Sequence, residues 1–432
     1  MKKLTVCGRF LAYESGEPFF YLADTAWELF HRLNREEAQA YFAQRKRQGF
    51  TAVQAVALAE FEGVTTPNSY GRLPFLFKDG TPDPTAPDTE GEYSYWDHVD
   101  YIVDLAAECG IFITLLPTWG DKYNQLWGKG PVIFNEENAE IYGAWIGARY
   151  AQKENIIYML GGDRPLEPCH RRIIDRMAKG IKKADQNHLI TFHPSGCSDS
   201  TECVLDAPYI DFHTLQSGHN TVMSYKSDEV LLQMAQKTPL PYMDSEPRYE
   251  DHPPCFNGDF GYYYTDAEVR QNAYWDVFTG ACGHTYGNHC VWSMTREPTN
   301  YFPYTYKDAL CHKGAEQMRH LRTLRESYDY FSFSPAPELI GSAYAGMGHM
   351  AAARGKGYAF LYSPLGIPFT VKLSGFSEDS EYLRAFWFDP RNGEKTIFAA
   401  LPKHGDMTLV PPSQGMGCDW VLILEEVNSK KQ

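Results

Sequence analysis

The feature that most constrains the fold of this chain is an alternation of helical segments with short strands that are apolar throughout. Strands that are apolar on both faces are typical of a parallel sheet covered by helices on both sides. Eight strand and helix units in residues 1–330 predict a (β/α)8 TIM barrel. The strands read PFFYLAD, FTAVQAVAL, IFITLLPTWGD, NIIYMLGGD, HLITFHPSG, YIDFHTLQSGH, LPYMDSEPRYE and HTYGNHCVW.

A doubly wound open sheet is the rival arrangement for the same alternation. That fold usually carries a glycine-rich phosphate turn directly after its first strand. Here the first strand runs into "ADTAW", which has no glycine. The barrel is therefore the favoured interpretation.

The pattern changes after "SPAPEL" at 334–339, where helical periodicity ends. Short apolar runs such as "GYAFLYSP" and "DWVLILEE" alternate with turns, and "DPRNGE" is a strong hairpin signal. We therefore expect two domains: a TIM-barrel catalytic domain at 1–335 and an antiparallel β-sandwich at 336–432.

Charge and composition limit the partners of the protein. The net charge of −15 argues against binding to nucleic acid or to an anionic membrane surface. No segment holds the roughly 20 apolar residues that a membrane span requires. Lys2 and Lys3 are followed by Arg9, Glu14 and Glu17 instead of the apolar run of a signal peptide. The ten cysteines form no CxxC pair, so we expect reduced thiols and a cytoplasmic protein.

Two acids end strands that face each other across the predicted barrel mouth. Asp163 ends the fourth strand after Gly161 and Gly162, and Glu246 ends the seventh. Cleavage of a glycosidic bond needs one carboxylic acid to protonate the leaving oxygen, and one carboxylate to attack the anomeric carbon or activate water. Crowding raises the proton affinity of one acid while the other stays ionised. We expect the two glycines to clear space for a proton donor at Asp163.

Several segments resemble a known enzyme family. "FFYLADTAWELFHRL", "RKRQGFTAVQAVAL", "YMLGGDRP", "YMDSEPRYE" and "GACGHTYGNHCVW" resemble the apiosidase-like glycoside hydrolases known from glycoside hydrolase family 140. Residues 336–432 resemble the C-terminal domain usually attached to that family, once labelled a collagen-binding domain. The resemblance implies a retaining hydrolase of β-apiofuranosides, which occur in pectic side chains. It places Asp163 at the acid/base position and Glu246 at the nucleophile position.

A carbohydrate is the expected partner, and further residues at strand ends are candidates for binding it. Tryptophan rings stack on the apolar faces of sugars, and the Asp24 carboxylate can bond to hydroxyls. The histidines can bond to hydroxyls or to Glu246, and Arg164 can hold Asp163 or bind an acidic sugar. A long turn-rich segment at 60–95 is expected to shape one wall of the pocket. The substrate-binding candidates are Asp24, Trp27, Trp119, Arg164, His193, His213, His289 and Trp292.

Two other functions compete with this prediction. A metal-dependent barrel hydrolase usually carries an HxH pair at its first strand end, and this chain has neither that pair nor an HExxH motif. We therefore expect no metal ion and no cofactor. A barrel that binds glycans without catalysis is the second alternative, and saturable sugar binding without turnover would favour it.

Overall fold

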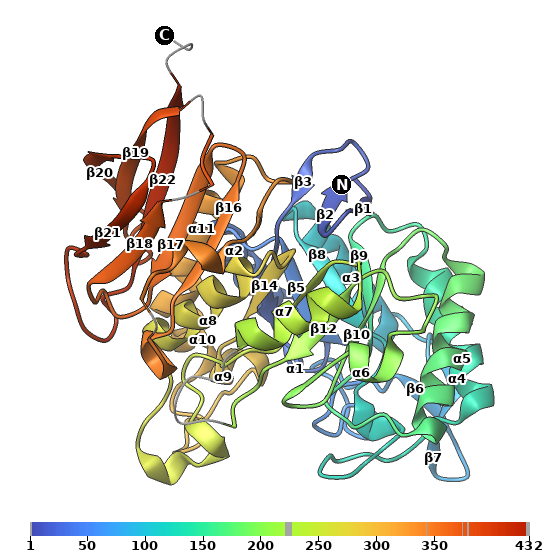
Figure 1. Ribbon diagram of the computed structural model, residues 1–432. Coiled ribbons are helices and arrows are strands. Elements are labelled where there is room, and N and C mark those ends of the chain that lie inside the picture. The colour runs from blue at the N-terminus through green and yellow to red at the C-terminus, as the bar shows by residue number, and fades with distance from the viewer. Residues whose placement is uncertain (1, 221–226, 343, 374, 378–379, 429–432) are drawn as a thin grey trace.

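The computed structural model describes residues 2–220, 227–342, 344–373, 375–377 and 380–428. Figure 1 shows a barrel of strands and helices, with an antiparallel β unit packed against its side. The barrel strands are β4 (Tyr21–Thr25), β5 (Ala52–Val56), β8 (Phe112–Leu116), β9 (Ile156–Gly161), β10 (Ile190–His193), β12 (His213–Gln216), β13 (Tyr242–Asp244) and β14 (Gly283–Tyr286).

These eight strands close into a ring. Six of them form a parallel sheet in the order β10-β9-β8-β5-β4-β14, and β12 pairs in parallel with β13. The Asp211 amide donates to the Ile190 carbonyl at 2.8 Å and so joins β12 to β10. The Cys282 amide donates to the Tyr242 carbonyl at 3.0 Å and joins β14 to β13. The predicted (β/α)8 barrel is therefore confirmed.

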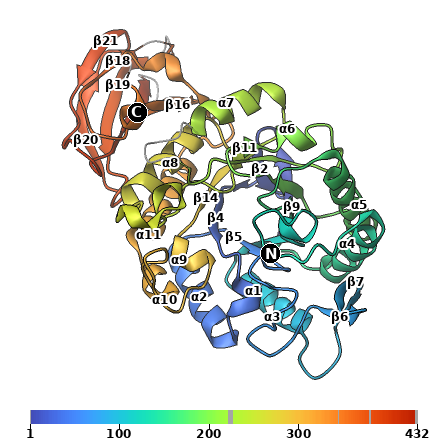
Figure 2. The same ribbon diagram turned by 90° about the horizontal axis from the view of Figure 1, so that it is seen from below.

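Helices surround this ring, as the view along the barrel shows (Figure 2). The predicted start of the first long helix at Asn34 is confirmed: its side chain accepts from the Glu37 amide, while the Glu37 carboxylate accepts from the Asn34 amide. The helices are α1 (Leu29–Arg32), α2 (Arg35–Arg47), α3 (Tyr95–Glu108), α4 (Glu136–Tyr150), α5 (Pro168–Ala184), α6 (Thr201–Val204), α7 (Ser227–Lys237), α8 (Asp266–Phe278), α9 (His289–Trp292), α10 (Tyr306–Ala309) and α11 (Lys313–Glu326).

Shorter strands cover one end of the barrel and decorate its side. β1 (Leu4–Cys7), β2 (Phe10–Tyr13) and β3 (Pro18–Phe19) form an antiparallel sheet at the N-terminal ends of the barrel strands, where the Phe19 ring lies 5.1 Å from that of Phe112. The loops that follow the strands lie at the opposite end of the barrel, where the strands end. The remaining short strands are β6 (Phe75–Lys78), β7 (Thr81–Pro87) and β11 (Ser198–Asp199).

The C-terminal part is a β-sandwich, as predicted. One sheet has six strands in the order β15-β16-β17-β22-β19-β20, and β18 pairs with β21 in a second sheet. Leu361 and Leu422 of the first sheet share a buried core with Val371 of the second. The strands are β15 (Ser334–Pro335), β16 (Ala351–Gly355), β17 (Tyr358–Ser363), β18 (Phe369–Leu373), β19 (Ser380–Phe388), β20 (Lys395–Leu401), β21 (Gly405–Leu409) and β22 (Trp420–Asn428).

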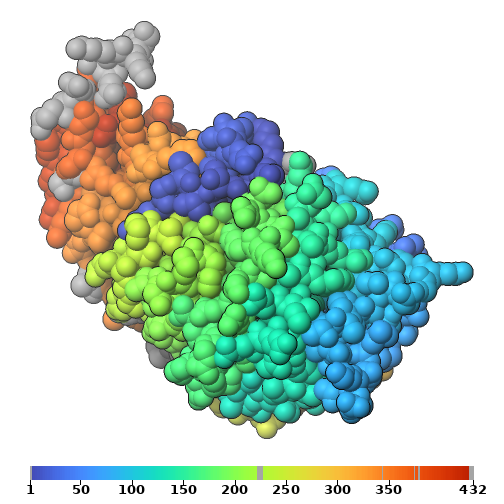
Figure 3. All heavy atoms as spheres, turned by 90° about the vertical axis from the view of Figure 1, so that its right-hand side faces the viewer, coloured from blue at the N-terminus to red at the C-terminus, as the bar shows by residue number. Residues whose placement is uncertain are grey.

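The sandwich packs against the barrel through α8 and the chain segment before β15. Phe278 of α8 and Phe360 of β17 belong to one buried core, and the Trp275 indole donates to the His349 carbonyl at 2.8 Å. Figure 3 shows the N-terminal residues, in blue, lying against the orange part of the C-terminal sandwich. Near this contact the Phe10 ring packs 5.4 Å from that of Tyr330. The division at residue 335 stays a prediction. No helix in the described part of the chain combines the length and apolarity of a membrane span.

Candidate active site

A cavity of about 450 Å³ lies where the barrel strands end, and we call it the deep cavity. Both predicted catalytic acids, Asp163 and Glu246, line it. Its remaining wall is mostly aromatic. The aromatic residues that line it include Trp27, Phe61, Trp119, Trp127, Tyr249 and Trp292.

The backbone after β9 explains how Asp163 reaches this cavity. Gly161, Gly162 and Asp163 have φ angles of +93°, +116° and +51°, a left-handed region that suits glycine. A Cβ on Gly162 would lie 2.9 Å from the ring of Trp119, and one on Gly161 would lie 2.4 Å from the His193 carbonyl oxygen. The two glycines therefore let the chain turn between Trp119 and β10, and this turn delivers Asp163 to the cavity.

The surroundings of Asp163 favour its protonated form. Burial raises the pKa of its carboxyl group, and the nearby charge of Glu246 raises it further. Arg164 opposes both effects, with Nη1 at 3.1 Å from Oδ2, and the Trp127 indole donates to the same oxygen at 3.2 Å. The side chain is still 24% exposed, so its carboxyl group can meet a ligand.

The surroundings of Glu246 favour its ionised form. Burial opposes ionisation, but hydrogen bonds from His193 and His219 outweigh it and lower the pKa of Glu246 to about 2. Nε2 of His219 lies 3.1 Å from Oε1, and Nε2 of His193 lies 3.0 Å from Oε2. Because carboxylates and carbonyls only accept hydrogen bonds, His219 carries its proton on Nε2, whereas Nδ1 of His193 donates to the Pro194 carbonyl at 3.0 Å. The surroundings thus shift the pKa values of the two acids in opposite directions.

A third carboxyl group, that of Glu60, also lines the deep cavity. Nη2 of Arg164 donates to its Oε1 at 2.6 Å, so one guanidinium bridges Glu60 and Asp163. Burial raises the pKa of Glu60 to about 7, although Arg164 opposes the shift. The Arg164 guanidinium also lies 4.4 Å from the centre of the Trp127 ring. This network holds the Asp163 carboxyl group in place.

The three tryptophans predicted to bind sugar all line the deep cavity. Trp27 follows β4, Trp119 follows β8 and Trp292 ends α9. The Trp27 and Trp119 rings pack 5.0 Å apart. Apolar faces of this kind suit the C–H side of a sugar ring.

Three other predicted binding residues lie behind the cavity wall. His193 is fully buried and contacts Glu246, and Arg164 is buried between Glu60 and Asp163. His289 accepts a hydrogen bond from the Trp292 indole at 3.2 Å. None of the three lines the deep cavity. The contacts of His193 with Glu246 and of Arg164 with Asp163 agree with one of the alternatives predicted for each of them, and direct sugar binding by the three residues stays a prediction.

Two predicted binding residues lie away from the cavity. The Asp24 carboxylate is fully buried and accepts from Arg45 Nε at 2.6 Å, because the strand end turns this side chain toward α2. His213 is the first residue of β12, at the end of the barrel opposite to the cavity, and its Nδ1 lies 2.8 Å from Ser200 Oγ. The sequence prediction placed His213 at the wrong end of its strand, because Gln216 is the residue that ends β12.

Loops supply site residues that the sequence prediction missed, among them Trp127, His219, Tyr249 and Phe256. His219 follows β12 in the predicted "LQSGH" segment, so the end of that segment was the available signal. The expected wall from residues 60–95 is reduced to Glu60 and Phe61. Residues 75–87 of that segment form the β6–β7 hairpin, which packs beside α4.

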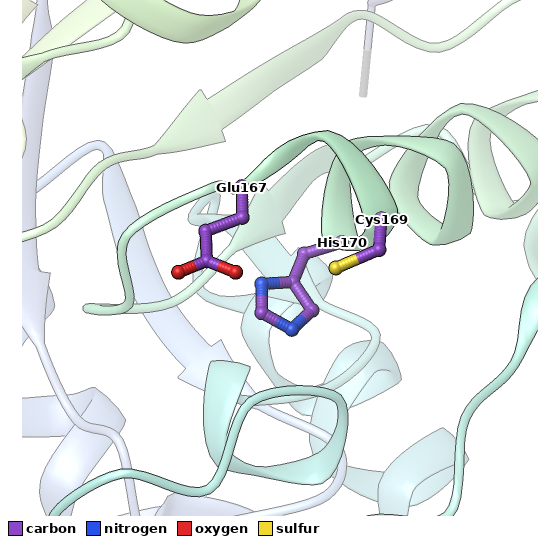
Figure 4. Close-up of side chains that lie close together, drawn as sticks. All are labelled: Glu167, Cys169 and His170. Carbon is purple, nitrogen blue, oxygen red and sulfur yellow. The ribbon is translucent and has the colours of Figure 1, made fainter.

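A group of metal-type donors lies outside the cavity. Glu167, Cys169 and His170 gather at the start of α5 (Figure 4), with ligand atoms within 4.8 Å of one another. Glu167 and Cys169 are exposed, and none of the three lines the deep cavity. This group is therefore separate from the paired acids.

Family models match both parts of the chain. A model described as "Apiosidase-like, catalytic domain" matches residues 6–332. A second, described as the "collagen-binding domain of a collagenase", matches residues 335–425. None of the curated proteins matches the sequence.

Solved structures resemble the whole chain. One, described as a glycoside hydrolase, is 30% identical with a TM-score of 0.87, and the match covers 100% of this chain and 98% of that one. A glycoside hydrolase family 5 protein from Bacteroides vulgatus ATCC 8482 is also 30% identical, with a TM-score of 0.88 and coverage of 98% and 93%. An endo-1,4-beta-mannanase from Rhizomucor miehei shares the fold alone, at 14% identity, a TM-score of 0.51 and coverage of 73% and 99%.

Proposed function

Because this chain belongs to the apiosidase-like family of glycoside hydrolases, we propose that it is a retaining enzyme in which Asp163 is the acid/base and Glu246 the nucleophile. One observation carries the assignment: two carboxyl groups line one cavity, and their surroundings raise the pKa of Asp163 and lower that of Glu246. We further propose β-apiofuranosides as the substrate class, on the strength of the family match.

The first half of the reaction uses both acids in their resting forms. An oxygen of Glu246 attacks the anomeric carbon and forms a glycosyl ester, while the bond from that carbon to the leaving oxygen breaks. The proton of Asp163 passes to the leaving oxygen, so the departing group is a neutral alcohol. The raised pKa of Asp163 keeps that proton available, and the lowered pKa of Glu246 keeps the nucleophile ionised.

The second half of the reaction reverses these roles. Asp163, now a carboxylate, takes a proton from water, and the water oxygen attacks the anomeric carbon. The ester bond to Glu246 breaks, and its carboxylate returns to the hydrogen bonds from His193 and His219. Two displacements at one carbon retain its configuration. Trp27, Trp119 and Trp292 supply apolar faces for the bound sugar.

A screen of aryl glycosides that includes apiosides tests the reaction and its substrate together. We expect hydrolysis of the β-apiofuranoside, and proton NMR of the first product should show the β configuration. A product that begins in the α configuration would contradict the double displacement. Turnover of another glycoside in place of the apioside would overturn the substrate class and leave the two-acid mechanism standing.

Replacement of the acids tests the assignment of roles. We expect Asp163→Asn and Glu246→Gln each to lower kcat by at least about 10³-fold on a substrate with a sugar leaving group. Glu62→Gln is the matched control, because the Glu62 side chain is 55% exposed and does not line the deep cavity. Unchanged kcat in either variant, with a normal circular dichroism spectrum, would refute the assigned role.

A further inference from the structure

The side chains of Glu167, Cys169 and His170 gather at the start of α5, and we call this group the α5 cluster. Each residue offers one ligand atom of the kind that binds metal ions, and the three atoms lie within 4.8 Å of one another. Figure 4 shows the three side chains directed to the same side of the helix start. The α5 cluster thus joins three different ligand types, a carboxylate, a thiol and an imidazole, that the proposed reaction does not use.

The ligand groups of the α5 cluster are not engaged elsewhere in the described part of the chain. Glu167 is the residue before α5, and its side chain makes no hydrogen bond to the first amides of that helix. Cys169 is a free thiol at the surface. Nδ1 of His170 is a buried atom, and it has no hydrogen-bond partner among the described residues. A buried nitrogen without a partner costs free energy, and a bound metal ion would supply the partner.

The basic side chains that follow in α5 are paired with other acids. Nε of Arg171 lies 2.7 Å from Oδ1 of Asp175, and Nε of Arg172 lies 2.7 Å from Oε1 of Glu136. Neither guanidinium group therefore compensates the charge of Glu167. The chain as a whole carries a net charge of −15, which raises the local concentration of cations. The charges around the α5 cluster are thus compatible with a bound cation.

The mixture of ligand types indicates which ion fits. Thiolate sulfur and imidazole nitrogen bind Zn²⁺ at about 2.3 and 2.0 Å, and a carboxylate oxygen binds it at about 2.1 Å. Mg²⁺ and Ca²⁺ prefer ligand sets made of oxygen alone. One carboxylate and one thiolate together carry two negative charges, which balance a divalent ion. These features favour zinc.

Small movements are enough to give the three ligand atoms the spacing of a zinc site. Ligand atoms around tetrahedral zinc lie about 3.5 Å apart, so atoms within 4.8 Å of one another need to approach by roughly 1.3 Å at most. Glu167 and Cys169 can rotate because both are exposed. The His170 ring is half-buried and lies 5.8 Å from the ring of Tyr123, which is 3% exposed. The imidazole is therefore the fixed ligand to which the other two can move.

We propose that the α5 cluster is a zinc site with three protein ligands and a fourth position open to water. The ion joins the residue before α5 to the first turn of the helix, at the end of the link 164–167 that follows Asp163. It stabilises the start of α5 and lies outside the deep cavity. The expectation of no metal ion rested on the absence of HxH and HExxH motifs, and the spacing Glu-x-Cys-His is neither of these.

Titration of the reduced, metal-free protein with Co²⁺ tests the sulfur ligand. Cobalt can replace zinc in such sites, and a thiolate ligand gives it an intense charge-transfer band in the near ultraviolet. We expect one equivalent of Co²⁺ to produce this band in the unaltered protein and in Cys7→Ser, which removes another exposed thiol, but not in Cys169→Ser. The absence of the band in the unaltered protein, or its persistence in Cys169→Ser, would overturn the proposal.

Calorimetric titration with Zn²⁺ tests the other two ligands. We expect the dissociation constant to rise by about 10-fold or more in Glu167→Gln and in His170→Ala, since even groups that only orient a ligand change metal affinity by this much. Glu62→Gln is the matched control, because the Glu62 side chain is 55% exposed and lies outside the α5 cluster. Unchanged affinity in Glu167→Gln or in His170→Ala would refute the three-ligand site.

Thermal melting tests whether the ion stabilises the fold. With Zn²⁺ at about 100 times its dissociation constant, Tm should rise for the unaltered protein and for Cys7→Ser but not for Cys169→Ser, because only the folded site binds the ion. Melting without metal checks that each variant is folded. A Tm of the unaltered protein that zinc leaves unchanged would contradict the stabilising role. None of these readouts uses a substrate, so they are independent of the proposed function.

Discussion

The two carboxyl groups of the deep cavity differ in their neighbours more than in their burial. Glu246 faces two imidazole rings, those of His219 and His193, whose Nε2 atoms lie 3.1 and 3.0 Å from its oxygens. Asp163 shares its guanidinium neighbour, Arg164, with Glu60, so one positive charge is divided between two acids. The pKa values of the two acids are thus set by residues three or four positions beyond the ends of their strands, namely Arg164, His219 and Glu60, and by His193 at the end of β10.

Removal of one imidazole should move the acidic limb of the pH profile. Glu246 must be ionised to attack, and its pKa is lowered because hydrogen bonds from His193 and His219 outweigh burial. In His219→Phe one of these hydrogen bonds is lost, the pKa of Glu246 rises, and kcat/KM falls at a higher pH as the solution is acidified. His404→Phe, an exposed position in the sandwich, is the control. An unmoved acidic limb would contradict this role of His219.

Removal of the Glu60 carboxyl group should move the basic limb of the pH profile of activity. Glu60 has a pKa of about 7, raised by burial, and above that pH its charge competes with Asp163 for Arg164. Glu60→Gln leaves the guanidinium to Asp163, so the pKa of Asp163 falls and activity is lost at a lower pH as the solution becomes more basic. Glu62→Gln should leave the limb in place. A shift of the basic limb to higher pH would refute the competition.

At the scale of elements, the strands could be predicted from sequence and most of the cavity wall could not. Runs such as "NIIYML" are apolar on both faces, a pattern typical of parallel strands that helices cover. The ends of the strands β9 and β13, predicted in this way, pointed to Asp163 and Glu246. Trp127 and Phe256 come from irregular loops without periodicity, so their arrival depends on tertiary packing. His213 was misplaced because β12 begins, and does not end, at that residue.

We expect a single methyl group added at Gly162, in the turn after β9, to lower both stability and activity. In Gly162→Ala the new Cβ would lie 2.8 Å from the Gly120 nitrogen and 2.9 Å from the Trp119 ring, at a φ of +116°. We expect a loss of about 3 kcal/mol in the free energy of unfolding, together with a lower kcat as Trp119 and Asp163 are displaced.

Gly110→Ala separates strain from steric overlap in that experiment. Gly110 has a φ of +75° with nothing within 4 Å of an added Cβ, so its substitution should cost only about 1 kcal/mol and leave kcat unchanged. Equal losses of stability at the two positions, measured by urea unfolding, would show that overlap with Trp119 does not matter.

At the scale of the whole molecule, the sandwich is tied to the barrel by a buried ion pair. Arg270 of α8 and Asp419, just before β22, are 1% and 2% exposed, and Nη2 lies 2.5 Å from Oδ1. Neither residue lines the deep cavity. We therefore expect the pair to stabilise the contact between sandwich and barrel and to take no part in the reaction.

Breaking this pair should destabilise the protein without slowing the reaction. Asp419→Asn removes the more buried of the two carboxylates that pair with the Arg270 guanidinium, the other being Asp266 at 2.7 Å. We expect the free energy of unfolding to fall by about 3 kcal/mol while kcat at 25 °C stays the same. Glu17→Gln is the control, because Glu17 pairs with Lys2 at the surface and both side chains are more than half exposed. Urea unfolding and steady-state kinetics on the same samples measure the two effects. A large loss of kcat would contradict the claim that this ion pair affects stability alone.

Mass spectrometry of a trapped intermediate tests the central claim most directly. In Asp163→Ala, a dinitrophenyl glycoside can still transfer its sugar, because dinitrophenolate leaves without a proton, whereas water then lacks its base. Rapid quenching should show protein heavier by one sugar residue, with the added mass on the peptide that carries Glu246. Product formation with no adduct on that peptide at any time, or an adduct on another residue, would contradict the account.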